Sequence, residues 1–207
     1  MHLATVGKKI LGDIYTPVGI YLRLRDRFRD TILLESTDHH AHENSYSFIC
    51  INAIGGIEVK NNDTIEYKLP GTDPEKLALD KKINVHQYLW DFMNKFNVEK
   101  LLDSQFQFAQ GLYGYTCFDA VSFFDTAIPS QTKEPLIPLI RYRLYQYVIA
   151  FNHFKDELII CENKIPGLAG DLQVIETLIR SKDVPVYPFS LVGNERSNMT
   201  NESYIEM

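Results

Sequence analysis

The residues with the clearest chemical potential lie between two apolar segments, 31–36 and 46–52. Three histidines, His39, His40 and His42, stand there close to acidic residues, and three imidazoles are able to bind zinc. Metal sites usually draw their ligands from rigid elements with an oriented outer shell, which a polar loop does not provide. We therefore expect solvated histidines, and neither a metal site nor a bound cofactor in this chain.

Ser36 ends the first apolar segment, directly after Leu34 and Glu35. Side chains of a strand alternate between its two faces, so Leu34 and Ser36 share one face and Glu35 takes the other. A serine directed into a core needs a hydrogen-bond partner. From the residues alone, that partner is either a backbone group of the next loop or a polar small molecule.

No catalytic residues are predicted in this chain. The sequence contains no H-E-x-x-H, G-x-S-x-G or C-x-x-C pattern. The glycine-containing stretch Gly111–Asp119 lacks the endings of nucleotide-binding loops, and its glycines favour close backbone approach or a bulge, with Asp119 capping a following helix. Cys50, Cys117 and Cys161 are odd in number and widely spaced, which favours small buried side chains in a reducing compartment.

A helix is predicted before the first apolar segment. Thr16 is a suitable N-cap, and Pro17 fits the first helical position because its missing N–H has no partner there in any helix. Helical spacing predicts that the buried face consists of Val18, Tyr21, Leu22, Arg25 and Phe28.

The rest of the chain indicates an α+β fold. Period-two alternation predicts hairpins over 55–69 and 140–163, while Asn84 begins one helix and residues 172–180 form another. Hairpins separated by helices, without a βαβ rhythm, favour antiparallel, sandwich-like β-sheets with flanking helices.

Composition excludes several classes of partner. The chain has 207 residues, 45% of them hydrophobic, which is enough for a sizeable core. Its net charge of −6 gives no electrostatic case for nucleic-acid binding. No run approaches the roughly 18 apolar residues of a membrane span, and we expect no secretory signal, because the first residues lack a charged start followed by an apolar stretch. We expect a cytoplasmic protein without nucleic-acid or membrane partners.

Three stretches carry a resemblance to a known family. The helix after Thr16, the Leu33–Ser36 strand end and the Tyr46–Ile49 strand resemble, in order and spacing, the N-terminal region of anthranilate synthase component I. Gly111–Asp119 is similar to the Gly-x-x-Gly-Tyr-x-x-Tyr-Asp stretch of anthranilate and aminodeoxychorismate synthases, with Phe118 in place of the usual tyrosine. Residues 197–204 resemble the start of the family's chorismate-binding domain.

The resemblance implies a function for these residues. In the family, the serine that matches Ser36 contacts tryptophan, the feedback inhibitor, so Ser36 would bind tryptophan with Leu34 and Glu35 as pocket wall. Residues 1–195 would be the regulatory domain, and 196–207 the truncated start of the catalytic domain. The complete enzyme converts chorismate and ammonia, which a glutaminase subunit supplies from glutamine, into anthranilate and pyruvate with Mg²⁺.

Two alternatives remain open. Aminodeoxychorismate synthase component I, of the folate pathway, shares these motifs and the glutaminase partnership. A free-standing amino-acid-binding or interaction module is the other alternative. A helix that starts after Thr200 and stops after about two turns argues against such a module and indicates a piece of a longer protein. Because the magnesium ligands and the acid/base residues would lie beyond it, we expect the piece alone to be inactive.

Overall fold

The computed structural model describes residues 1–35, 45–79, 84–125, 134–181, 183, 188–194 and 196–206. The elements within these ranges, in chain order, are β1 (His2–Leu11), α1 (Pro17–Leu24), β2 (Ile32–Glu35), β3 (Tyr46–Val59), β4 (Thr64–Lys68), β5 (Glu75–Ala78), α2 (Val85–Met93), β6 (Asn97–Val98), the 3₁₀ helix η2 (Ser104–Gln110), β7 (Tyr113–Thr116), the 3₁₀ helix η3 (Phe118–Phe123), β8 (Ile140–Asn152), β9 (Glu157–Lys164), α3 (Leu172–Arg180) and α4 (Asn201–Ile205). No described helix is long and apolar enough to cross a membrane.

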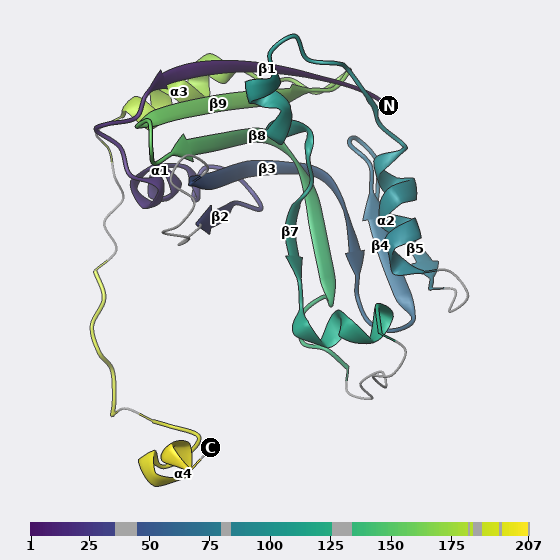
Figure 1. Ribbon diagram of the computed structural model, residues 1–207, viewed down its shortest axis with the longest axis vertical. Coiled ribbons are helices and arrows are strands. Elements are labelled where there is room, and N and C mark those ends of the chain that lie inside the picture. Colours follow the sequence, from purple (N-terminus) through teal and green to yellow (C-terminus); the bar gives the residue numbers. More distant parts are fainter. Residues whose placement is uncertain are drawn as a thin grey trace.

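The described strands form one nine-stranded sheet in the order β5-β4-β3-β8-β9-β1-β6, with β2 added to β3 and β7 added to β8 (Figure 1). Only the short β1–β6 pair is parallel. The predicted α+β class and antiparallel pairing are therefore confirmed. The sandwich-like stacking is not observed, because the strands predicted at 46–52 and 55–60 are one continuous strand that joins both regions into a single sheet.

β3 and β8 bend together and divide the sheet into two parts. The register between them shifts at Ala53/Gly55, and Asn52 takes a left-handed conformation with φ 59°. On one side of the bend, β3 pairs with β2 and β8 pairs with β9. On the other side, β3 pairs with β4 and β8 pairs with β7. We call the part with β1, β2 and β9 the first half-sheet and the part with β4, β5 and β7 the second half-sheet (Figure 1).

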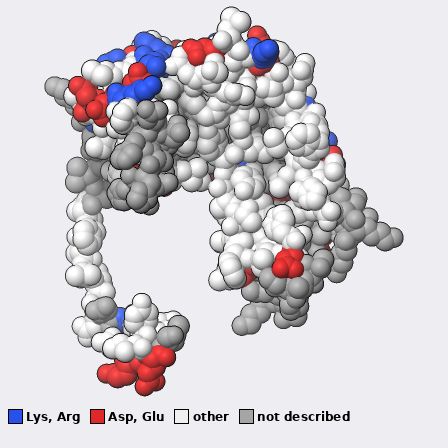
Figure 2. All heavy atoms as spheres, viewed as in Figure 1, with Lys and Arg blue, Asp and Glu red and all other residues white. Residues whose placement is uncertain are grey.

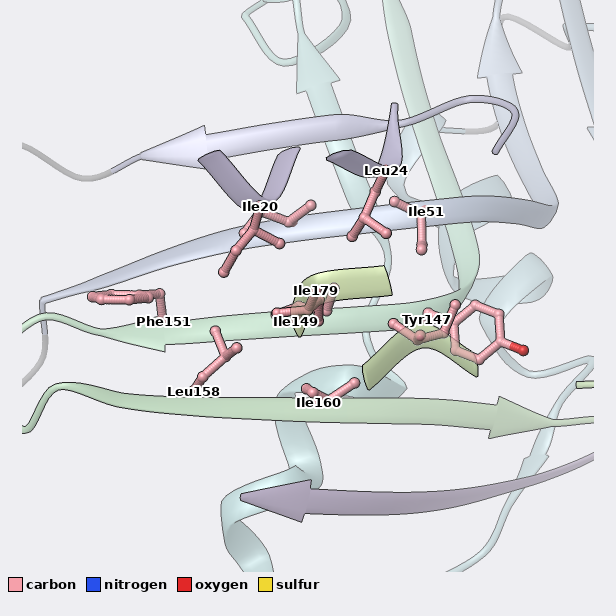
Figure 3. Close-up of a cluster of buried hydrophobic side chains, with 11 residues drawn as sticks. Ile20, Leu24, Ile51, Tyr147, Ile149, Phe151, Leu158, Ile160 and Ile179 are labelled. Atoms are coloured by element: carbon pink, nitrogen blue, oxygen red, sulfur yellow. The ribbon is translucent and has the colours of Figure 1, made fainter. Parts of the chain in front are cut away.

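Helices α1 and α3 cover one face of the first half-sheet. Thr16 caps α1 as predicted, its hydroxyl accepting a hydrogen bond from the Gly19 N–H at 3.0 Å. The predicted buried face of this helix is wrong in part. Tyr21 and Phe28 pack against the core as predicted, but Ile20 and Leu24 are the fully buried residues and Val18 is 46% exposed. The buried residues Pro17, Ile20 and Leu24 are three and four positions apart, so they form one face of the helix, and this face meets the sheet. The core of this region consists of Ile20, Leu24, Ile49, Ile51, Tyr147, Ile149, Phe151, Leu158, Ile160, Ile175 and Ile179 (Figure 3).

A second core lies between the second half-sheet and α2. Asn84 occupies the predicted N-cap position of α2, although its side chain makes no capping hydrogen bond. Val85 and Phe92 of α2 are buried, and Phe92 packs its ring against Phe96 at a centroid distance of 5.4 Å. These residues cover the alternate positions of β3 and β4 that include Ile57 and Ile65.

The surface charges are arranged in pairs. Figure 2 shows basic side chains gathered at the end of the first half-sheet near α3, with acidic side chains next to them. The ion pairs Arg27–Asp183 at 3.4 Å and Lys9–Glu157 at 3.2 Å are examples. Such exposed pairs contribute about 1 kcal/mol or less to stability.

Candidate ligand-binding face

The end of β2 carries two of the three residues predicted to bind a ligand. Leu34 pairs with Phe48 of β3, and Glu35 pairs with Ser47. Directly paired residues share a face of an antiparallel sheet, so Leu34 and Glu35 lie on opposite faces. Leu34 is half-buried and Glu35 is exposed. Ser36 lies outside the described residues.

An aromatic cluster adjoins Leu34 on its face of the sheet. The ring of Phe48 stacks on Tyr46 at a centroid distance of 6.0 Å and contacts Phe108 and Tyr113, each at 5.6 Å. A hollow of about 490 Å³ opens beside this cluster, and we call it the aromatic hollow. Its lining residues are Tyr46, Phe48, Ser104, Gln105, Gln107, Phe108 and Ile159. Aromatic rings with a few polar groups are typical of pockets for small organic ligands.

The wall of the aromatic hollow that η2 provides is fixed by one fully buried asparagine. The Asn163 Nδ2 donates to the backbone oxygens of Ala109 at 2.6 Å and Tyr145 at 2.9 Å. Its Oδ1 accepts a hydrogen bond from the Thr5 hydroxyl at 2.7 Å. Asp103 also caps η2, its carboxylate accepting from the Gln105 N–H at 3.0 Å. The position of this wall therefore depends on β1, β8 and β9 together.

A serine–histidine pair lies on the other face, next to Glu35. The Ser47 hydroxyl and His153 Nε2 are 2.8 Å apart. Such a pair is the core of many nucleophilic sites. Ser47 is only 1% exposed, however, so its hydroxyl is not accessible to a substrate. The pair joins β3 to the end of β8, and we assign it a structural role.

The histidine loop that the sequence singled out cannot be placed, because His39, His40 and His42 lie outside the described residues. Among the residues that are described, no group of histidine, cysteine and acidic side chains could hold a metal ion. Cys50 and Cys161 are buried, as predicted, and burial raises the pKa of the Cys161 thiol to about 12. Both thiols are therefore protonated at neutral pH.

The stretch Gly111–Asp119 contains β7 and the start of η3. A Cβ atom on Gly114 would overlap the backbone oxygen of Arg141, so glycine permits the close approach of β7 to β8 that the sequence predicted. Gly111 is much less constrained, since the nearest atom to such a Cβ, the Phe108 oxygen, would be 3.3 Å away. The predicted capping by Asp119 is wrong: Cys117 occupies the N-cap, and Asp119 lies within the first turn.

Sequence reasoning predicted a ligand site at the β2 end and did not predict the aromatic hollow or the Ser47–His153 pair. Tyr46 and Phe48 were recognisable as strand residues, and their period-two spacing places both rings on one face. Nothing in the local sequence indicates that η2, about 60 residues later, supplies the opposite wall.

Comparison with known proteins found distant similarity over three quarters of the chain. No family model matches the chain. It is 25% identical, over 162 residues, to anthranilate synthase component 1 of Lactococcus lactis subsp. lactis (strain IL1403), covering 75% of this chain and 32% of that protein. It is 26% identical, over 166 residues, to anthranilate synthase component 1 of Acinetobacter calcoaceticus, covering 75% of this chain and 31% of that protein.

The chain thus has an α+β fold built on one mostly antiparallel sheet, and it spans about a third of the length of the curated relatives it matches. The protein it resembles is anthranilate synthase component 1, as the sequence motifs predicted.

Proposed function

We propose that this chain is the N-terminal, tryptophan-binding part of an anthranilate synthase component I. Residues 1–195 form its regulatory domain and residues 196–207 begin its catalytic domain. The similarity to two proteins of that name over 75% of the chain is the observation that carries the proposal. The complete protein then forms anthranilate and pyruvate from chorismate and ammonia, in the cytoplasm, as a lyase of tryptophan biosynthesis.

In this role the other parts of the enzyme come from outside the chain. A glutaminase subunit supplies ammonia, and the catalytic domain holds Mg²⁺ and chorismate. The chain's own contribution is feedback control, in which bound tryptophan favours a less active state of the complete enzyme. Such control requires that tryptophan bind the two states with different affinity.

The aromatic hollow supports tryptophan as the ligand. Its rings at Tyr46 and Phe48 offer an indole the offset or edge-to-face contacts that stabilise aromatic pairs by about 0.5–1.5 kcal/mol beyond the buried area. Leu34 adjoins Phe48 on the same face and provides an apolar contact. In the proposal, the indole lies against these side chains.

The edge of β2 supports binding of the amino-acid end. Among the described strands, β2 pairs only with β3, so its outer N–H and C=O groups are available to a ligand. In the proposal, Ser36, which follows Glu35 in the sequence, donates or accepts one hydrogen bond to tryptophan. Glu35 is exposed at the same edge, where its carboxylate can accept from the ligand's ammonium group.

The test is an assay of the complete protein with chorismate, Mg²⁺ and ammonia, in which anthranilate is followed by its fluorescence. We expect anthranilate, with inhibition by tryptophan. Formation of aminodeoxychorismate instead would support the alternative enzyme of the folate pathway, with which this chain shares the Gly111–Asp119 stretch. Absence of both products from folded, magnesium-loaded protein would refute the proposal.

The isolated chain provides a second measurement. Its catalytic residues would lie elsewhere, so we expect no turnover above background from residues 1–207. Calorimetric titration should show weaker binding of tryptophan to this chain than to the complete protein, because part of the pocket wall would come from the catalytic domain. Equal affinity would show that the pocket is complete within this chain.

A further inference from the structure

A second hollow lies where the start of β2 approaches β7, and we call it the arginine hollow. It measures about 220 Å³ and shares no lining residue with the aromatic hollow. The side chains important here are Asp30, Tyr113, Tyr115, Arg141, Arg143 and Tyr145. They gather on one face because β7 pairs with β8, with Tyr113 opposite Arg143 and Tyr115 opposite Arg141.

The two arginines of this hollow are held in place by carboxylates. Arg141 pairs with Asp30 at 2.9 Å and with Glu58 at 3.3 Å, and the Arg143 Nη2 also pairs with Glu58. The side chain of Glu58 is 5% exposed, so these pairs lie mostly out of water. A guanidinium has five N–H donors, and within the described chain only the Nη2 of Arg143 has a partner. Arg143 therefore keeps donors for a ligand.

Tyr145 adds a hydroxyl without a partner. This residue is only 4% exposed and lines the hollow, yet its hydroxyl makes no hydrogen bond to any described residue. The neighbouring Tyr113 shows the usual arrangement, since its buried hydroxyl donates to the Phe108 oxygen at 2.9 Å. Burial raises the pKa of Tyr145, so its hydroxyl stays protonated and able to donate.

The charges of the hollow select among anions. The lining carries the guanidiniums of Arg141 and Arg143 and one carboxylate, Asp30. Glu58 lies outside the lining and pairs with both arginines and with Lys60, so the whole set has a net charge of +1. A monoanion bound to the free donors of Arg143 neutralises this single excess charge, whereas a dianion leaves a net negative charge close to Asp30 and Glu58. The planar guanidinium matches a carboxylate in particular, because both can form two parallel hydrogen bonds.

Size and lining limit the rest of the ligand. The hollow is smaller than the roughly 300–1,000 Å³ of pockets for drug-sized molecules, so the ligand is small. The rings of Tyr113 and Tyr115 and the side chain of Ile32 form the walls, which favour an apolar or aromatic body.

We propose that the arginine hollow binds the carboxylate of a small aromatic or apolar monoacid, with Arg143 and the Tyr145 hydroxyl as donors. The proposal concerns residues other than Leu34, Glu35 and Ser36, and it does not rest on tryptophan binding. It assigns this hollow a ligand of its own.

In the experiment, the 207-residue chain is titrated with benzoate. Binding is measured by calorimetry and by the chemical shifts of the backbone amides near Tyr145. Benzamide, a neutral molecule of the same shape, and phenyl phosphate, a dianion, are the comparison probes. We expect saturable binding of benzoate. The other two probes should bind at least roughly tenfold more weakly than benzoate does.

Matched variants locate the site. Tyr145→Phe removes a hydroxyl with no described partner, so it leaves the fold intact and should weaken benzoate binding roughly two- to tenfold. Arg143→Lys keeps a positive charge beside Glu58 but loses the planar donor pair, and should weaken binding further. Tyr142→Phe is the control, because the Tyr142 hydroxyl is 3.2 Å from Thr116 and its ring packs on the opposite face.

Three results would overturn the proposal. The first is an absence of saturable benzoate binding to the folded chain. The second is that Tyr145→Phe binds benzoate as tightly as the unchanged chain does, or that benzamide binds as tightly as benzoate. The third is tighter binding of phenyl phosphate, which would reject a monoacid as the ligand class.

Discussion

Replacing Asn163 with leucine is expected to destabilise the domain through three hydrogen bonds at once. The side chain is fully buried and is bonded to the Thr5 hydroxyl and to the backbone oxygens of Ala109 and Tyr145. Leucine has a similar size but offers no polar atom, so all three groups lose their partner away from water. At about 0.5–1.5 kcal/mol for each bond, the expected loss is about 1.5–4.5 kcal/mol.

Thr5→Val is the graded control for this change. It removes only the bond between the hydroxyl and Asn163 Oδ1, so we expect a loss of about 1 kcal/mol. For a chain of this size, 1 kcal/mol corresponds to about 2–4 °C in melting temperature. Asn163→Leu should therefore lower the melting temperature by about 3–18 °C and clearly more than Thr5→Val does.

The assay combines calorimetric unfolding with hydrogen exchange of the η2 amides. Because Asn163 connects η2 to the sheet through Ala109, exchange in residues 104–110 should rise more than exchange in α3. In the double variant, the two losses should not add, since both remove the same Thr5–Asn163 bond. A melting temperature of Asn163→Leu equal to that of Thr5→Val, with unchanged exchange in η2, would refute the reasoning.

The remaining predictions address inhibition, packing, backbone approach and pH. Ser36→Ala in the complete enzyme should weaken tryptophan inhibition roughly tenfold or more, and Ser36→Arg should abolish it, with uninhibited activity retained; inhibition curves decide, and unchanged inhibition in Ser36→Arg would place the site elsewhere. Ile20→Ala should cost about 2–5 kcal/mol in denaturant unfolding and Val18→Ala only about 0.5, because Ile20 is fully buried and Val18 is not; the reverse order would mean that α1 packs through its other face. Gly114→Ala should lower the melting temperature far more than Gly111→Ala, since only the former pushes β7 off Arg141; equal effects would contradict the close approach. Burial alone would raise the pKa of Glu58, but hydrogen bonding to Lys60 and the charges of Arg143 and Lys60 outweigh it and lower that pKa below its usual value of 4.5. The stabilisation by ionised Glu58 is therefore complete above about pH 4.5 and is lost as the pH falls further. Glu58→Gln should flatten this loss of stability in acid, as measured by melting temperatures from pH 7 to pH 3.

The local elements were predictable because their signals lie within a few residues. Thr16-Pro17 fixes the start of α1, and residues 172–180 show a helical pattern that matches α3 residue for residue. The hairpin of β8 and β9 follows from alternating strands that flank a short turn. These features depend little on the rest of the chain.

The features that were not predicted depend on distant residues. The pattern around Asn52 was divided into two strands, because the bend arises from pairing with β8, about 95 residues away, and not from local sequence. Similarly, Ile20 faces the core because α3 and the sheet meet α1 on that side.

The candidate site divides in the same way. Leu34 and Glu35 were predicted from a motif within one strand, and the structure adds their cross-strand neighbours Phe48 and Ser47. The opposite wall depends on the Thr5–Asn163 bond, which joins residues 158 positions apart. No pattern within a window of ten or twenty residues contains that information.

The long pairing of β3 with β8 also determines how this chain folds. Tyr46 pairs with Asn152, and Val59 pairs with Ile140, so the two central strands meet only after loops of about 80 to 105 residues close. Non-local pairing of this kind slows folding, because chain entropy is lost before the contacts that compensate it form. The hairpin of β8 and β9 needs only a short turn and can form early, before β3 arrives. Substitutions at the β3–β8 pairing should therefore alter the refolding rate more than equally destabilising changes in α2, and until that step is complete β8 exposes an unpaired edge on which chains can aggregate.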